Sequence, residues 1–158
     1  MTELSKSEQR VEAVLRAHKL KTDIVRLDDN AHTAQQAADA LGIEVAQIVK
    51  SLVFRGAESD KAYLLFVSGA NRVHEKRAGR LIGEKLGRAD ADFVREHTGF
   101  AIGGVSPLGA TGQVDIFIDE TLFAYDELWA AAGHPKSVFQ TSANELVTLT
   151  GAKSLNVL

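Results

Sequence analysis

Two stretches of this 158-residue sequence hold residue types that could act chemically on a small ligand. In the first, Lys50 interrupts the apolar, strand-like run Ile48–Phe54 and shares one strand face with Ile48 and Leu52. Burying a lysine on an apolar face is costly unless its charge is compensated. The side chain therefore either reaches water from an edge strand or presents a cation into a pocket, and the pattern allows both.

The second stretch, Thr98–Gly112, reads T-G-F-A-I-G-G-V-S-P-L-G-A-T-G and contains five of the thirteen glycines. Glycine serves where φ must be positive or where another group approaches the backbone closely. Adjacent Gly103 and Gly104 leave peptide N–H groups uncovered by side chains, which suits the lining of a small-ligand pocket. A loop with several tight turns explains the same glycines. Ser106 precedes Pro107, which favours an extended conformation at Ser106.

The familiar catalytic motifs are absent. The sequence has no G-x-S-x-G elbow, no P-loop and no H-E-x-x-H. Because it has no cysteine and its five histidines show no ligand spacing, we expect no thiol nucleophile, metal site or cofactor. Ser106 lacks an activating base nearby, since the nearest histidine, His97, lies across a flexible loop. We interpret Ser106 as structural or hydrogen-bonding.

The run T-G-F-A-I-G-G-V-S-P-L-G closely resembles the Gly-rich loop of the YbaK/ProX family of free-standing aminoacyl-tRNA deacylases, relatives of the editing domain of bacterial prolyl-tRNA synthetases. V-K-S-L-V-F at Val49–Phe54 lies where that family keeps its essential lysine. The resemblance runs from about Leu20 onward. It implies a trans-editing hydrolase that removes a small wrong amino acid from tRNA, most readily tRNA for proline, with help from the tRNA 2′-hydroxyl.

The resemblance also implies a set of site residues. Lys50 would hold a phosphate or the terminal ribose, and the amides of Gly103 and Gly104 would stabilise charge on the ester carbonyl oxygen. The implied substrate-binding residues are Thr33, Ser51, Gly99, Ser106, Pro107 and His134.

Three of these positions need closer consideration: two have a second interpretation, and one departs from the pattern of relatives. Thr33 opens the capping-box sequence T-A-Q-Q, and we favour the helix cap as its first role. Ser51 stands where alanine-directed relatives carry Asn, which argues against an alanine-only specificity. His134 precedes Pro135 and resembles a pocket histidine of some relatives, but an ordinary surface loop explains it nearly as well.

The charge of the chain bears on its partners. A net charge of −3 argues against a protein that grips nucleic acid by bulk electrostatics, so we expect no DNA partner. Arg72, Lys76, Arg77 and Arg80 nevertheless cluster, either as a solvated helix face or as a patch for a phosphate backbone. If the partner is the acceptor end of an aminoacyl-tRNA, weak intrinsic affinity suggests help from prolyl-tRNA synthetase or an elongation factor.

The remaining pattern predicts the fold. No apolar run approaches ~18 residues and the N-terminal segment lacks an apolar signal core, so we expect no membrane segment and a cytoplasmic location. Helices and strands alternate, with a hairpin at Ile48–Val67 and a helix from Asp126 through Ala132. We expect one mixed α/β (α+β) domain, residues 1–158, and the family likeness implies a sheet curled towards a barrel with helices outside.

Two other functions fit the sequence. One is a non-catalytic module that binds a tRNA 3′ end or a synthetase, which would show saturable binding without turnover. The other is a hydrolase of different small activated esters, whose activity would ignore the tRNA body.

Overall fold

The computed structural model describes residues 3–28, 30–31 and 33–158. Within them the α-helices are α1 (Lys6–Ala17), α2 (Ala34–Leu41), α3 (Glu75–Ile82), α4 (Ala91–Thr98) and α5 (Ala143–Thr150), with 3₁₀ turns η1 (Val45–Gln47) and η2 (Glu120–Ala124). The strands are β1 (Val25–Arg26), β2 (Ile48–Gly56), β3 (Ala62–Ser68), β4 (Leu86–Arg88), β5 (Asp115–Asp119), β6 (Leu128–Ala131), β7 (Ser137–Thr141) and β8 (Lys153–Leu155). No helix in these ranges is long and apolar enough to cross a membrane.

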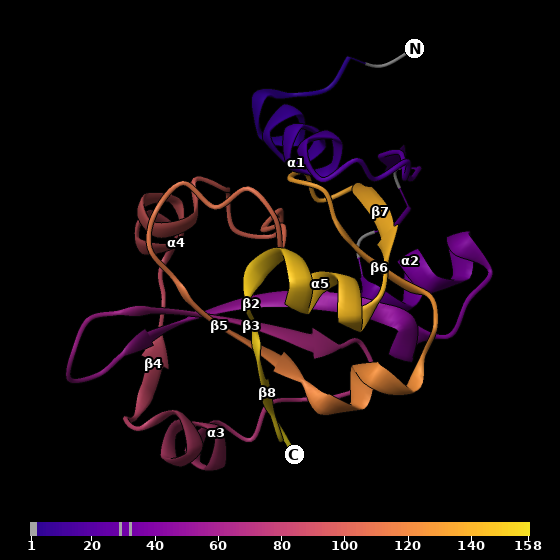
Figure 1. Cartoon of the computed structure of the whole chain (residues 1–158). Helices are drawn as coiled ribbons and strands as arrows, with labels where there is room; N and C mark the ends of the chain where they lie inside the picture. Colours follow the sequence, from indigo (N-terminus) through magenta and orange to yellow (C-terminus); the bar gives the residue numbers. More distant parts are fainter. Residues whose placement is uncertain (1–2, 29, 32) are drawn as a thin grey trace.

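The strands form one mixed sheet in the order β1-β7-β6-β2-β3-β5-β8, with β4 also pairing with β2. Pairs β2–β3, β2–β4, β6–β7 and β1–β7 are antiparallel, whereas β2–β6, β3–β5 and β5–β8 are parallel. The predicted mixed α/β fold is confirmed, and so is the predicted hairpin between β2 and β3. The sheet stays open, with β1 and β8 at its two ends, and β2, β3 and β5 lie side by side in its middle (Figure 1).

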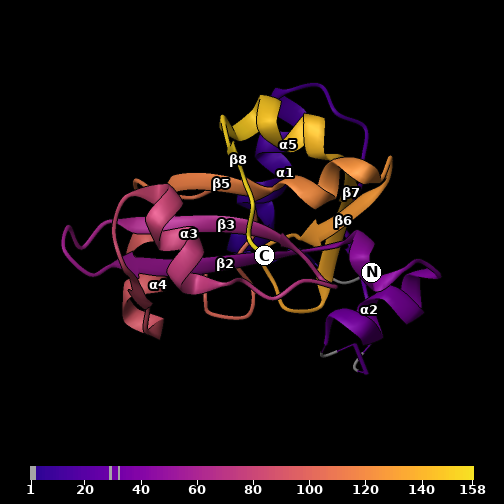
Figure 2. The same ribbon diagram turned by 90° about the horizontal axis from the view of Figure 1, so that it is seen from below.

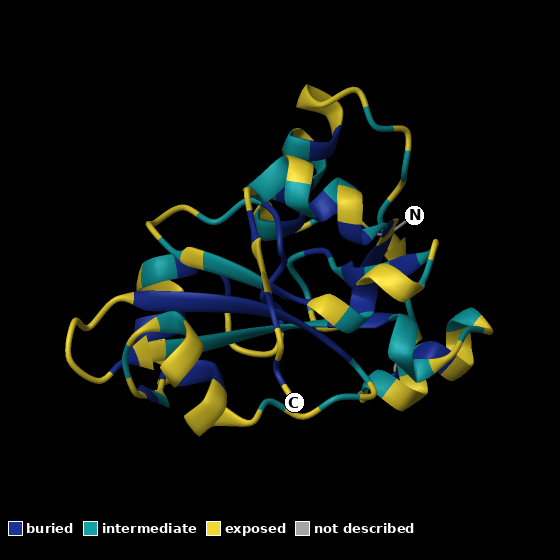
Figure 3. Ribbon diagram, turned by 60° about the horizontal axis from the view of Figure 1, so that its bottom comes forward, coloured by how far each residue is buried: buried dark blue, intermediate teal, exposed yellow. Residues whose placement is uncertain are grey.

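Strand β3 separates two hydrophobic cores. Leu64 and Phe66 pack into a cluster that includes residues of α1, α4 and α5. Leu65 and Val67 point to the opposite face, into a cluster with α3 and the C-terminal residues. Buried residues are accordingly concentrated in the central strands, and exposed ones in the outer turns and helix faces (Figure 3). The alternation of Leu64 and Phe66 with Leu65 and Val67 between the two faces follows from the two-residue period of a strand.

Local sequence signals explain the helix starts. Ser5, Thr33, Asp90 and Ser142 each accept a hydrogen bond from a backbone N–H in the first turn of the helix that follows. Thr33 forms the predicted capping box, in which Gln36 reaches back to the Thr33 N–H. Such caps satisfy backbone donors that a helix leaves unpaired, so short polar residues mark helix starts well.

The predicted helix Asp126–Ala132 is wrong, because this segment contains strand β6. The residues Leu-Trp-Ala-Ala suit a helix by composition. In the structure Ile48 of β2 pairs with Trp129 in parallel, and β7 pairs with β6 on its other side. Leu128 and Ala130 are buried at a two-residue period. Pairing with distant strands therefore overrides the local preference.

Candidate active site

Strand β2 has a full-length partner on one edge only. Strand β3 pairs with residues 49–55 along that edge. On the other edge, β6 pairs with residues 48–49 and β4 pairs with residues 54–56. The middle of β2 therefore faces a gap between two short strands. Figure 2 shows α4 near one end of β2 and α2 near the other, which brackets this gap.

A pocket of about 450 Å³ lies over the gap in the sheet. Most of its lining is apolar and much of it is small. The lining residues outside β2 are Leu27, Ala31, Thr33, Ala34, Ala37, Ala89, Val94, Ile102, Gly103, Val105, Trp129, Ala131, Pro135 and Val138. They come from α2 and the segment before it, the segments around β4 and α4, the Gly-rich loop and the β6–β7 hairpin. The pocket is thus assembled from parts of the chain that are far apart in sequence.

Lys50 lines this pocket and is half-buried. Its Nζ donates a hydrogen bond to the main-chain carbonyl oxygen of Asn71 at 2.5 Å. Burial lowers the pKa of the Lys50 ammonium, and the nearby Arg72 guanidinium lowers it further, whereas the Asp119 carboxylate raises it. The structure therefore places a partly desolvated cation at the pocket, with one of its three protons already engaged.

Ser51 offers polar groups to the same gap. The bonds Gly56 N–H to Lys61 O and Gly69 N–H to Ile48 O show that even-numbered residues of β2 direct their main-chain groups towards β3. The main-chain groups of Ser51 therefore point to the opposite edge, into the gap. Its Oγ is buried and has no hydrogen-bond partner among the described residues. Buried polar groups are normally paired, so this hydroxyl is available to a ligand.

The two central glycines of the Gly-rich loop differ in their surroundings. Gly103 is exposed, lines the pocket and has φ +87°. Gly104 is buried, and its N–H donates to the carbonyl oxygen of Ala101 at 3.0 Å. This bond closes a four-residue turn whose third residue, Gly103, needs the positive φ that glycine tolerates. Of the two glycines, Gly104 has its amide engaged within the turn, and Gly103 lines the pocket.

The structure places Gly99, Ser106 and Pro107 away from the pocket lining. Gly99 is the left-handed C-cap of α4, and its carbonyl oxygen accepts from Arg10 Nη2 at 2.7 Å. Ser106 is fully buried, and its Oγ accepts from the Leu108 N–H at 3.2 Å. Pro107 lines a different hollow next to α1. These three residues shape and anchor the loop, while its other side faces the pocket.

Thr33 and His134 lie at the margins of the pocket. Thr33 both lines it and caps α2, so its two interpretations hold together. The ring Nδ1 of His134 accepts from the Lys136 N–H at 3.1 Å, which leaves the proton of a neutral ring on Nε2. Pro135 lines the pocket, whereas His134 does not. Across the described ranges, no group of three or more His, Asp or Glu side chains could hold a metal ion.

Several lining residues were missed by reasoning from sequence. Ala31, Ala34 and Ala37 follow one another at helical spacing before and along α2, and this run of small residues was a readable signal of a wall. Ile102 is 59% exposed beside the two glycines, which is unusual for a large apolar side chain. Trp129 gave no such signal, because its segment was predicted as a helix.

Comparison with known proteins identifies the family. Residues 28–149 match the family described as the aminoacyl-tRNA editing domain. The chain belongs to this family. The match spans α2, the whole of β2, the Gly-rich loop and most of α5, so every pocket-lining residue except Leu27 lies within it.

Relatives of this editing-domain protein include free-standing chains and parts of larger enzymes. A crystal structure described as a candidate trans-editing enzyme for prolyl-tRNA synthetase superposes with a TM-score of 0.90, at 44% identity over 98% of both chains. The uncharacterized protein YwhH of Bacillus subtilis is 29% identical over 84% of both chains. A proline–tRNA ligase of Limosilactobacillus fermentum is 32% identical over 58% of this chain, which corresponds to 17% of the ligase.

Proposed function

We propose that this editing-domain protein is a trans-editing hydrolase, which removes a small, wrongly attached amino acid from tRNA for proline. The observation that carries the proposal is the pocket at the open edge of β2, lined mainly by small apolar residues and bordered by Lys50. Membership of the editing-domain family supports the reaction class. The relation to a candidate trans-editing enzyme for prolyl-tRNA synthetase supports the choice of tRNA.

The pocket suits a second sieve for small amino acids. A synthetase site cannot strongly reject an amino acid that is smaller than the correct one or has the same shape. A separate pocket of about 450 Å³ with alanine walls can accept such residues and hydrolyse their esters. The hydroxyl and main-chain groups of Ser51 supply polar contacts for the ammonium and carbonyl groups that every aminoacyl ester carries.

The chemistry requires little from the protein's side chains. Water attacks the ester carbonyl carbon, the bond to the 3′-oxygen of the terminal ribose breaks, and the free amino acid and tRNA leave. The neighbouring 2′-hydroxyl of the tRNA helps to position and activate the water, and the proton that the water loses ends on the released 3′-oxygen. The Gly103 amide stabilises the charge that develops on the carbonyl oxygen, and Lys50 holds the phosphate or ribose.

Binding of tRNA needs more than the net charge provides. The chain carries a formal charge of −3, while the basic residues Arg72, Lys76, Arg77 and Arg80 lie on the exposed side of α3 and the segment before it. We infer that this local patch contacts the acceptor arm and that prolyl-tRNA synthetase or an elongation factor strengthens the encounter. A protein with this substrate works where translation does, in the cytoplasm.

The test is hydrolysis of tRNA for proline charged separately with Ala, Ser, Cys, Thr and 2-aminobutyrate. Lys50→Ala is the active-site variant, and Lys61→Ala, an exposed lysine beside β3, is its matched control. We expect wild type and the control to clear at least one substrate, and Lys50→Ala to lose about 100-fold or more in kcat/KM. Folded wild-type protein that binds these tRNAs without turnover would instead be a binding module. Equal rates on small free esters would make it a general ester hydrolase.

A further inference from the structure

A buried polar network stands behind Lys50. Asp119, at the end of β5, is 1% exposed. One of its carboxylate oxygens accepts from the Ser68 N–H at 3.1 Å and from Asn71 Nδ2 at 2.9 Å. The other accepts from the Thr121 N–H at 2.9 Å and from the Thr121 hydroxyl at 2.8 Å. These four hydrogen bonds fix the carboxylate in place.

Asn71 connects this network to Lys50. Its side-chain amide donates to Asp119 and also to Thr121 Oγ1 at 2.8 Å. Its own N–H donates to the Ser68 carbonyl oxygen, which closes the turn after β3. The Asn71 carbonyl oxygen is therefore held from both sides, and this is the atom that accepts from Lys50 Nζ. The lysine rests on a rigid support and not on a free loop.

The Asp119 carboxylate also offsets the positive charge of Arg72 near Lys50. Arg72 follows Asn71 directly and acts on Lys50 as a like charge. Asp119 acts on it as an opposite charge from the end of β5. Among the described residues, these are the two charged side chains that influence the Lys50 ammonium. Without Asp119, a half-buried lysine would face an arginine with no nearby anion.

We propose that Asp119, acting through Asn71, is the positioning residue for Lys50: it fixes the direction of the ammonium and supplies the opposite charge nearby. This inference rests on the proposed function in one respect: the proposed function supplies the substrate that Lys50 holds. Neither Asp119 nor Asn71 lines the pocket. Their contribution is to the orientation and protonation of the lysine that does.

The decisive experiment titrates Lys50 directly, by NMR of the full chain with ¹³Cε-labelled lysine. The Lys50 signal is assigned by its loss in Lys50→Met. Asp119→Asn should lower the pKa of Lys50, because it removes the nearby opposite charge. Asp115→Asn, which removes an exposed carboxylate at the other end of β5, should leave the titration unchanged. Equal Lys50 titration in folded wild type and Asp119→Asn would overturn the proposal.

A second variant tests the hydrogen-bonded link through Asn71 separately from the charge of Asp119. It also covers the case in which Asp119→Asn does not fold. Asn71→Ala removes both amide donors but leaves the Asp119 side chain in place. We expect the Lys50 Cε signal to move towards those of exposed lysines and kcat to fall about tenfold, with little change in KM. A wild-type Lys50 signal together with wild-type kcat in Asn71→Ala would contradict the positioning role.

The NMR readout also keeps this inference apart from the proposed function. If wild-type protein hydrolyses no mischarged tRNA, the proposed function fails while the Lys50 titration still decides the role of Asp119. If hydrolysis occurs, its alkaline limb should move to lower pH in Asp119→Asn by the same amount as the Lys50 pKa. If the pKa of Lys50 shifts in Asp119→Asn but the alkaline limb of the pH–rate profile does not, Asp119 does not act on catalysis through Lys50.

Discussion

A Cβ atom on Gly104 would lie 3.2 Å from Cδ of Pro135, so the Gly-rich loop and the β6–β7 connection meet there almost backbone to backbone. The same Cβ would lie 3.3 Å from the Cα of His134. These contacts fix the loop against the far wall of the pocket. The distance between the Gly103 amide and the open edge of β2 therefore depends on a glycine at position 104.

Replacing Gly104 should disturb the site as well as the fold. In Gly104→Ala the added methyl group must push the loop away from Pro135, and overpacking of this kind costs about 1–3 kcal/mol. We expect a lower unfolding midpoint in urea and a fall in deacylation. Gly87→Ala is the matched control, since its Cβ would be similarly tight, 3.3 Å from the Arg55 carbonyl oxygen. Equal activity loss in both variants would argue against a role for the loop position.

Gly103 should matter through its backbone conformation. A Cβ there meets no atom within 4 Å, so Gly103→Ala is strained by its φ of +87° alone, at a cost of about 1 kcal/mol. Gly151→Ala, at φ +72° and also in open space at the end of α5, should lose similar stability. Only Gly103→Ala should lower kcat, because the strain displaces the backbone of a residue that lines the pocket. Steady-state deacylation together with urea unfolding measures both effects.

The alanine wall of α2 should set the size of the accepted amino acid. Ala34→Leu would place three more carbon atoms in the pocket, and we expect hydrolysis of the largest accepted aminoacyl group to fall first. Ala40→Leu changes an exposed position of the same helix and should leave the substrate order intact. Rates for the five mischarged tRNAs provide the comparison. An unchanged order in Ala34→Leu would mean that this wall does not touch the amino acid.

Ser51 should show an unusual response to truncation. Its buried Oγ lacks a partner, so Ser51→Ala removes a desolvated hydroxyl and should raise the free energy of unfolding by about 1 kcal/mol. Ser68→Ala should do the opposite, because the Ser68 hydroxyl donates to the Ala46 carbonyl oxygen at 2.8 Å. If the hydroxyl binds substrate, KM rises in Ser51→Ala while stability improves. A clear loss of stability in Ser51→Ala would show that the hydroxyl is satisfied in solution.

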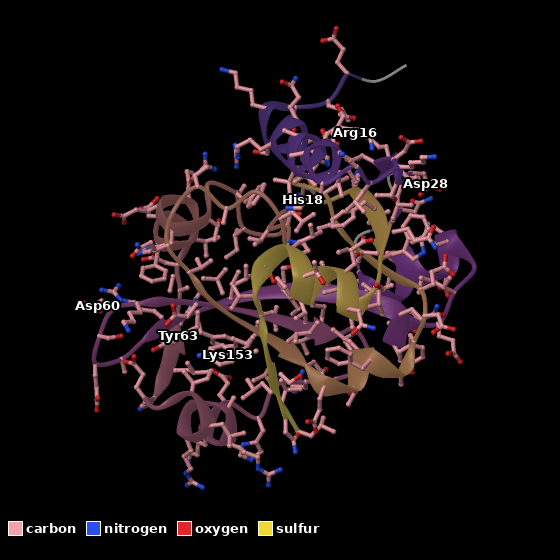
Figure 4. The ribbon with its side chains drawn as sticks, viewed as in Figure 1. Arg16, His18, Asp28, Asp60, Tyr63 and Lys153 are labelled. Carbon is pink, nitrogen blue, oxygen red and sulfur yellow. The ribbon has the colours of Figure 1, made fainter. Side chains whose placement is uncertain are left out.

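We expect Glu84 to make the free energy of unfolding sensitive to acid, because its carboxylate holds the β2–β3 turn by hydrogen bonds. Its carboxylate accepts from the Ser59 hydroxyl at 2.5 Å and from the Tyr63 hydroxyl at 2.6 Å. Figure 4 shows Asp60 at the outer tip of this hairpin and Tyr63 further in. The hydrogen bonds, that from the Ser59 hydroxyl first, lower the pKa of Glu84 to about 2.

The sign of the pH effect follows from this lowered pKa. Above pH 4.5 the carboxylate is ionised in both the folded and the unfolded chain, and its stabilisation is fully present. As pH falls from 4.5 to about 2, the unfolded chain takes up the proton first and the stabilisation is lost. Glu84→Gln should flatten the acid slope of unfolding free energy in this window, and Tyr63→Phe should flatten it in part. The same slope in wild type and Glu84→Gln would rule out this source.

Predictions from local patterns were the accurate ones. The Thr33 capping box and the β2–β3 hairpin both depend on residues close to one another in the sequence. The strand β6 was mistaken for a helix because only pairing with β2 and β7 makes it a strand. The short strand β4 was not predicted, because its three residues carry almost no pattern of their own and only pairing with β2 makes them a strand.

The sequence by itself determined the family, the pocket lysine and the loop. The Gly-rich run and the lysine in β2 are contiguous motifs, so their chemistry can be read without knowing the fold. Tertiary structure alone decided that the edge of β2 is open at Ser51, that Gly103 lines the pocket, and that Lys50 rests on Asn71, which Asp119 holds. These features arise from pairings between residues about 20 to 80 positions apart, which local propensity and periodicity do not encode.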